Sequence, residues 1–229
     1  MTPQFEKEID NVIKTKRFLL LLLALVVLLV AYPYFKDTRQ GAFLGGLASL
    51  ALIIFGIFAV RPNRHIFIIA SLLGGVTAAS SVTAKLAGIR GHPFVEGAFT
   101  VFYAFTTIAV FVEVIRSKEI GREAVYGIVC VYLLIGVTFG TLYDFLETVR
   151  PGSFEMTVPL AAGGGIGFRN MLFFSFMTLT TIGYGDIIPV TFQAQSLATI
   201  EGVVGVLYVA VLIARIVGIY SYHQKAAGK

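Results

Sequence analysis

The sequence predicts an all-α membrane protein, and three observations lead to that prediction. Charged residues make up 14% of the 229-residue chain and hydrophobic residues 57%, whereas a soluble domain carries about 25% charged residues. Six apolar stretches have the length of roughly 20 residues that a helix needs to cross the hydrocarbon core. A further segment, 178-TLTTIGYGDIIP-189, is rich in threonine and glycine although it lies between two of these stretches.

The six apolar stretches are expected to be membrane-spanning helices. They cover residues 18–35, 42–60, 66–86, 94–115, 124–146 and 195–219. The first follows a basic segment, as a signal peptide does, but it continues into AYPYF, an aromatic sequence typical of a membrane interface, and no small-residue cleavage site follows. We therefore expect it to be retained. Residues 1–17 are a cytoplasmic segment that is either an amphipathic helix on the membrane surface or a solvated terminus.

The distribution of Lys and Arg predicts the orientation. If the N-terminus is cytoplasmic, 12 of the 18 Lys and Arg residues fall in inside segments, which agrees with the excess of positive charge found on that side. Both termini are then cytoplasmic, in the plasma (inner) membrane, and the loop between the fifth and sixth spans lies outside.

The outer loop contains a segment that is too short to span the membrane. Residues 169–180 form a half-helix of about a dozen residues, and Pro189 stops any continuation. Non-helical backbone at membrane depth is tolerated only inside protein or beside an aqueous pore, so the segment is a re-entrant loop or an ordinary extracellular loop. Gly183 and Gly185 favour the re-entrant loop, because glycine permits a backbone that alternates in hand. Four copies of such a backbone would stack rings of carbonyl oxygens that replace the hydration shell of a monovalent cation.

The string TTIGYGD, Thr180 to Asp186, resembles the selectivity-filter signature of tetrameric potassium channels. The resemblance covers roughly residues 124–219, just under half of the chain. It implies a pore domain made of a helix, a pore helix, a filter and a last helix, and a fold of six transmembrane helices plus a re-entrant pore loop that assembles as a homotetramer.

The resemblance also assigns roles to single residues. The K⁺ ligands would come from Thr181, Ile182, Gly183 and Tyr184, with Gly185 keeping the outer mouth flexible. Filter support would come from Phe173, Phe174, Thr180 and Asp186, the last of these behind the filter. Met177 stands where some family members have a glutamate that pairs with this aspartate, so that carboxyl pair is absent. Tyr184 implies selectivity for potassium over sodium.

The last span would line the pore and carry the gate. Gly205, or Gly202 nearby, is either a gating hinge or a site of tight helix packing. Val209 and Ile213 would line an apolar cavity or an inner gate. Glu201 is a charge inside a span, and we expect it to brace the pore helix through Thr178 or Thr180, either protonated or hydrogen-bonded.

Arg215, near the inner end of the last span, either extends its side chain to lipid phosphates or forms an ion pair with Glu113 or Glu119 that would hold the gate.

The first four spans, residues 18–115, are expected to form a four-helix bundle, which is either sensor-like without gating arginines or simply a scaffold. Steep voltage sensing needs arginines repeated along the fourth span, and residues 94–115 contain no Lys or Arg. The tail, residues 220–229, is too short for a cytoplasmic ligand-binding domain.

These features predict a potassium-selective channel that conducts passively and is not steeply voltage-gated. Its partners are three further copies, the lipid bilayer and K⁺ as the permeant ion; no cofactor, nucleic acid or enzymatic activity is expected. The alternatives are a regulatory subunit of a channel assembly or a component of a potassium transporter, although transporters that resemble channels carry four filter repeats in one chain. A membrane scaffold with a fortuitous loop is the third alternative.

Overall fold

The computed structural model describes the backbone of residues 3–31, 39–61, 63–88, 91–116, 122–157 and 166–227. Side chains are described for residues 16–30, 45–61, 63–88, 91–116, 123–157 and 166–214. The predictions for Glu119, for residues 32–38 and for the side chain of Arg215 therefore concern parts of the chain outside the described residues.

The described residues form seven α-helices and two short strands. In chain order they are α1 (Pro3–Ala31), α2 (Arg39–Ala59), α3 (Arg64–Leu86), α4 (Pro93–Arg116), α5 (Arg122–Val149), β1 (Phe154–Met156), α6 (Phe168–Leu179), β2 (Ile187–Pro189) and α7 (Phe192–Ala227). Each predicted span falls largely on one helix, and the half-helix predicted at 169–180 is α6. The backbone of residues 3–17 is helical and continues into the first apolar stretch as part of α1.

Four described helical stretches are long and apolar enough to cross a membrane. They are Arg64–Leu86, Pro93–Arg116, Glu123–Val149 and Phe192–Ala214, and Gly45–Ala59 is a shorter apolar stretch. The structure therefore supports the predicted all-α membrane protein, while the number of six spans stays a prediction. The two strands are a local exception that the sequence did not predict.

The chain divides into two compact units, and the first contains Met1–Ala79 and Phe105–Leu134. Here α1 packs on α2, and apolar side chains such as Leu21, Leu25 and Leu52 are buried. The Arg17 guanidinium forms an ion pair of 2.8 Å with Glu113 and donates to the Ala59 carbonyl at 3.3 Å. These contacts fix the N-terminal end of the apolar part of α1 to α4 and α2.

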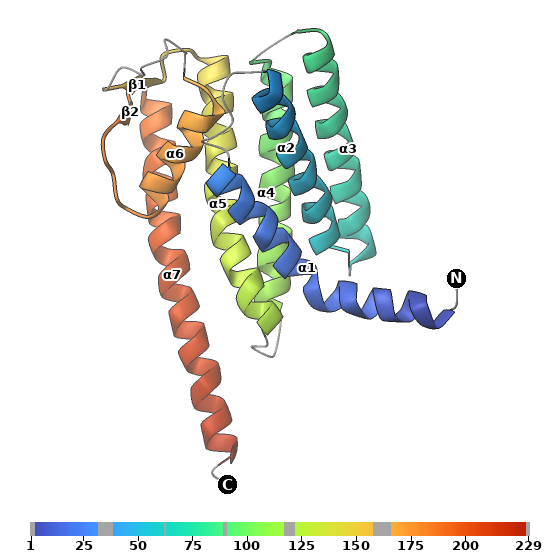
Figure 1. Cartoon of the computed structure of the whole chain (residues 1–229). Coiled ribbons are helices and arrows are strands. Elements are labelled where there is room, and N and C mark those ends of the chain that lie inside the picture. Colours follow the sequence, from blue (N-terminus) through green and yellow to red (C-terminus); the bar gives the residue numbers. More distant parts are fainter. Residues whose placement is uncertain are drawn as a thin grey trace. The chain divides into compact units, whose positions relative to one another are not determined.

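The second unit contains Ser80–Ala104 and Ile135–Lys229. In this unit α4 packs closely on α5. A Cβ atom added at Gly97 of α4 would lie 3.3 Å from the Phe145 ring of α5. Figure 1 shows α6 beside α7, with the chain after α6 returning toward β1 and β2. The two strands pair antiparallel, Glu155 opposite Ile188.

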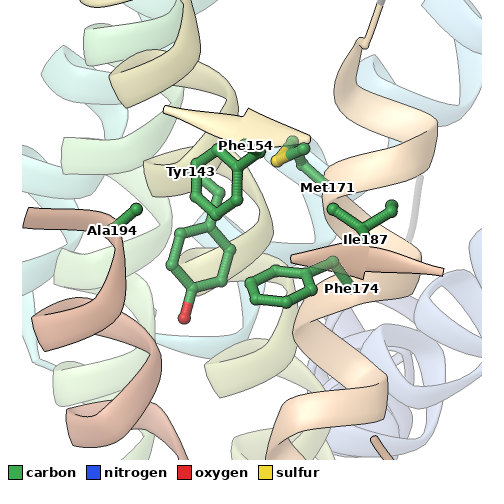
Figure 2. Close-up of a cluster of buried hydrophobic side chains, with 6 residues drawn as sticks. All are labelled: Tyr143, Phe154, Met171, Phe174, Ile187 and Ala194. Carbon is green, nitrogen blue, oxygen red and sulfur yellow. The ribbon is translucent and has the colours of Figure 1, made fainter. Parts of the chain in front are cut away.

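A cluster of buried side chains joins the second unit's elements. Its members are Tyr143, Phe154, Met171, Phe174, Ile187 and Ala194, drawn in Figure 2. Three of them form T-shaped ring pairs, in which the Tyr143 and Phe174 centroids lie 5.1 Å apart and those of Phe154 and Phe174 lie 5.4 Å apart. Burying a large apolar side chain contributes about 1.5–3 kcal/mol, so this cluster holds α6 firmly against α5, α7 and the strands.

Candidate functional site

The TTIGYGD segment, residues 180–186, follows α6 with a backbone that alternates in hand. Thr181, Gly183 and Gly185 have φ values of 60°, 58° and 82°, whereas Ile182 and Tyr184 keep negative φ. Glycine adopts positive φ without a steric penalty, and the sequence predicts the alternation at the two glycines. Thr181 was not predicted to share it. A β-branched residue in this region is strained by about 1–2 kcal/mol, so the surrounding structure must hold it there.

Hydrogen bonds to the end of α6 hold this backbone. The Met177 carbonyl accepts from the N–H groups of Ile182 at 2.9 Å and Gly183 at 3.2 Å. The Thr181 N–H donates to the Thr178 carbonyl at 3.0 Å. The N–H groups of Thr181, Ile182 and Gly183 thus point back toward α6.

The carbonyl oxygens of the same segment are left available. In the part of the chain that the structure describes, no hydrogen bond ends on the carbonyl oxygen of residues 181, 182, 183 or 184. These residues are exposed in the single chain, Ile182 by 50% and Tyr184 by 67%. A backbone carbonyl requires a partner. Four consecutive free carbonyls are therefore a set of oxygen ligands that water or a hard cation can satisfy.

The two phenylalanines predicted to support the filter have different positions. The Phe173 ring stacks on the Tyr184 ring, with centroids 6.3 Å apart and an interplanar angle of 5°. Phe174 instead belongs to the buried cluster. Both line a cavity of about 30 Å³ between α6 and the TTIGYGD segment, together with Met177 and Asp186. That volume is enough for one water molecule.

The side chain of Thr180 caps the C-terminal end of α6 with a hydrogen bond. Its hydroxyl donates to the Phe176 carbonyl at 2.6 Å, and the Thr178 hydroxyl donates to the Phe174 carbonyl at 2.9 Å. Both hydroxyls are therefore engaged within α6, which corrects the expectation that one of them bonds Glu201.

Glu201 lies at the centre of a buried polar network. Its side chain is 0% exposed. One carboxyl oxygen accepts from the Tyr143 hydroxyl at 2.6 Å, and the other lies 2.5 Å from the Ser175 hydroxyl. Ser175 also contacts the Gly136 carbonyl at 2.7 Å. Glu201 thus braces α6, as the sequence predicts, but through Ser175, and it connects α7 to α5 as well.

The number of hydrogens available in this network bears on whether the Glu201 carboxyl group is protonated. The Ser175 hydroxyl has one hydrogen, and the Gly136 carbonyl can only accept. If Ser175 donates to Gly136, the short contact with Glu201 is a hydrogen bond only when the carboxyl group carries the hydrogen. No ion pair of the described residues includes Glu201, and an isolated charge is very costly to bury. Both arguments indicate that Glu201 is neutral.

Gly205 is buried against the end of α6. A Cβ atom there would overlap the Leu179 carbonyl oxygen and lie 2.9 Å from the Leu179 side chain. At Gly202 a Cβ would meet nothing within 4 Å. The structure thus gives Gly205 a role in close packing, while hinge motion at either glycine stays a prediction. Val209 and Ile213 lie on the exposed apolar surface of α7.

The structure describes only one participant of the ion pair predicted to hold the gate, in which Arg215 would bind Glu113 or Glu119. Glu113, one of the two proposed partners of Arg215, forms its ion pair with Arg17. The carboxyl groups of Glu96 on α4 and Asp144 on α5 interact with each other. No group of three or more His, Cys, Asp or Glu residues able to hold a metal occurs among the described residues.

Sequence reasoning missed two members of the Glu201 network, Tyr143 and Ser175. Both are polar residues within apolar helices, which is a signal that could have found them. Their partners depend on how three helices pack, and helical periodicity along one segment does not report that.

Comparison with known proteins places the site within an ion-channel region. Residues 127–221 match a protein-family model described as "Ion channel". The inward rectifier potassium channel Kirbac3.1 of Paramagnetospirillum magnetotacticum is 36% identical over 84 residues, which are 35% of this chain and 24% of that protein. The potassium voltage-gated channel subfamily A member 7 of Homo sapiens is 28% identical over 106 residues, which are 45% of this chain and 21% of that protein.

The matched residues span less than a quarter of either relative. No solved structure matches the chain. With the apolar helices, these matches indicate a channel-type integral membrane protein and not an enzyme.

Proposed function

We propose that this chain is the subunit of a potassium-selective channel that conducts K⁺ passively through a homotetrameric pore. The observation that carries the proposal is the TTIGYGD segment, in which the carbonyl oxygens of residues 181–184 accept no hydrogen bond from any described residue and lie on a backbone that alternates in hand. Rings of such carbonyls replace the hydration shell of K⁺ in selectivity filters. The Thr181 hydroxyl would add a further ring of oxygens.

The number of TTIGYGD segments per chain supports assembly of several copies, which we propose form a homotetramer. One chain supplies one TTIGYGD segment, and a ring of carbonyls around an ion needs several. The exposed apolar side chains of α7, among them Val203, Val206 and Leu207, support a role for α7 in lining the pore or packing on other copies. Termini on the cytoplasmic side of the plasma membrane complete the proposal.

Gating by steep voltage sensing is not part of the proposal. A voltage sensor moves several arginine charges per subunit across the membrane field, each worth about 2.3 kcal/mol per 100 mV. Residues 94–115 of α4 contain no Lys or Arg. We therefore do not expect this chain to share the voltage gating that the name of the human relative states.

Reconstitution of the purified chain into liposomes tests the proposal. We expect rubidium or potassium flux down a potassium gradient, block by barium, and no flux with sodium alone. Equal sodium and potassium permeability would contradict selectivity. No flux from the chain alone, with altered flux when another channel subunit is added, would favour the regulatory-subunit alternative.

Replacing Tyr184 by aspartate should relax selectivity. Tyr184 is stacked on Phe173, and Asp lacks the ring that makes this contact, so the backbone at position 184 loses a lateral support. We expect sodium flux to rise toward potassium flux in Tyr184→Asp. Tyr184→Phe, which keeps the stacked ring, is the matched control and should stay potassium-selective. Unchanged selectivity in the aspartate variant would show that the ring does not support the filter.

A further inference from the structure

The segment between α5 and β1 is folded tightly around one carboxylate. Glu147 accepts hydrogen bonds from the N–H groups of Gly152 at 2.8 Å, Ser153 at 2.9 Å and Phe154 at 3.1 Å. Gly152 makes the turn with a φ of 81°. Because the carboxylate satisfies three consecutive donors, it fixes where β1 begins.

The strand that begins there pairs with the residues that follow the TTIGYGD segment. Phe154 lies opposite Pro189 and Met156 opposite Ile187. The Val190 N–H donates to the Ser153 carbonyl at 2.9 Å. Phe154 and Ile187 also belong to the buried cluster, so the two-stranded ribbon of β1 and β2 is held in place both by hydrogen bonds and by apolar packing.

Thr157 extends this pairing onto the TTIGYGD segment itself. Its N–H donates to the Asp186 carbonyl at 3.0 Å. Its hydroxyl donates to the Gly185 carbonyl at 2.7 Å. One residue therefore holds two consecutive carbonyls, immediately after the four carbonyls that have no hydrogen-bond partner among the described residues.

We propose that Thr157 is a positioning residue that fixes the outer end of the filter, an inference that rests on the proposed channel function. Gly185 has the backbone freedom of glycine and a positive φ, so its peptide planes can turn unless something holds them. Among the α6 side chains that line the cavity beside Asp186, Met177 offers no strong hydrogen-bond donor or acceptor, and the Thr178 hydroxyl donates to the Phe174 carbonyl. The hold on this end comes from Thr157 instead. By fixing the Gly185 and Asp186 carbonyls, Thr157 sets the position of the neighbouring Tyr184 carbonyl, which is an ion ligand.

The test compares three variants of the full chain in liposomes. Thr157→Val keeps the shape and the backbone N–H but removes the hydroxyl, and Thr157→Ser keeps the hydroxyl. Thr83→Val is the matched control, since the Thr83 hydroxyl also donates to a backbone carbonyl, that of Ser80 at 2.9 Å, but in α3. A hydrogen bond contributes about 0.5–1.5 kcal/mol, which is a factor of about 2 to 10 in an equilibrium constant.

We expect the sodium-to-potassium flux ratio of Thr157→Val to rise about two- to tenfold, with faster hydrogen exchange at the Val190 amide. Thr157→Ser and Thr83→Val should behave as the wild type does. Wild-type potassium flux with an unchanged ratio in Thr157→Val would overturn this inference and leave the channel function standing. An equal rise in Thr157→Ser would also overturn it, because the hydroxyl would not be responsible. Absence of potassium flux in the wild type would overturn the proposed function, and this inference with it.

Discussion

Gly205→Ala should abolish potassium flux and lower the thermal stability of the protein. The added methyl group would overlap the Leu179 carbonyl oxygen at the end of α6, and a backbone atom cannot move aside as a flexible side chain can. Overpacking of this kind costs about 1–3 kcal/mol, against which alanine returns about 1 kcal/mol of helix propensity. The overlap would force Leu179 and α7 apart. Because the residues after Leu179 form the proposed filter, this shift would also move the carbonyl oxygens of residues 181–184.

Gly202→Ala is the matched control for this change. It makes the same substitution one turn earlier in α7, where a Cβ meets nothing within 4 Å, so flux and stability should stay close to those of the wild type. Thermal unfolding in detergent and rubidium flux in liposomes measure the two effects separately. A Gly205→Ala protein with normal stability but altered open probability would support the hinge and count against close packing.

Glu201→Leu should destabilise the protein and impair potassium flux, whereas Glu201→Gln should be tolerated. Leucine leaves the buried Tyr143 hydroxyl without its acceptor and removes the bond to Ser175. A buried polar group without a partner costs about 1–3 kcal/mol. The amide of glutamine can accept from Tyr143 and donate to Ser175, which reproduces the bonds of a protonated carboxyl group.

Infrared spectroscopy checks the proton directly. A neutral Glu201 should give a carboxylic-acid C=O stretching band that disappears in Glu201→Gln, while thermal unfolding reports the stability of both variants. An ionised Glu201 would reverse the expectation, since glutamine would then replace an acceptor with a donor facing Ser175. A glutamine variant as unstable as the leucine variant would therefore contradict the neutral carboxyl group.

The helices could be predicted from the sequence because a bilayer imposes a length and an apolar composition on each span. The start of α6 at Phe168 rather than residue 169 is within the usual uncertainty of helix ends. The ribbon of β1 and β2 could not be predicted. Its strands are three residues each and are separated in the sequence by residues 157–186, so no local sequence pattern predicts their pairing.

The candidate site was predictable where its chemistry depends on the backbone and less so where it depends on packing. Gly183 and Gly185 reveal the alternating backbone because only glycine adopts it without strain. Thr181 gives no such signal, since its positive φ is imposed by the surrounding structure. The choice of Ser175 over Thr178 as the partner of Glu201 depends on the depth at which α7 meets α6. Thr157 directly follows the three-residue strand β1, and its contact with Gly185 could not be predicted because the pairing of that strand has no local sequence signal.

The interaction between the carboxyl groups of Glu96 and Asp144 has a consequence for chimeric proteins. Residues 80–104, which include the first half of α4, belong to the same compact unit as the TTIGYGD segment. A chimera that joins a foreign helical bundle to this pore at residue 122 would discard Glu96 and leave the buried Asp144 carboxyl group without that partner. A functional graft would therefore carry a neutral residue at position 144, or would bring the first half of α4 along with the pore.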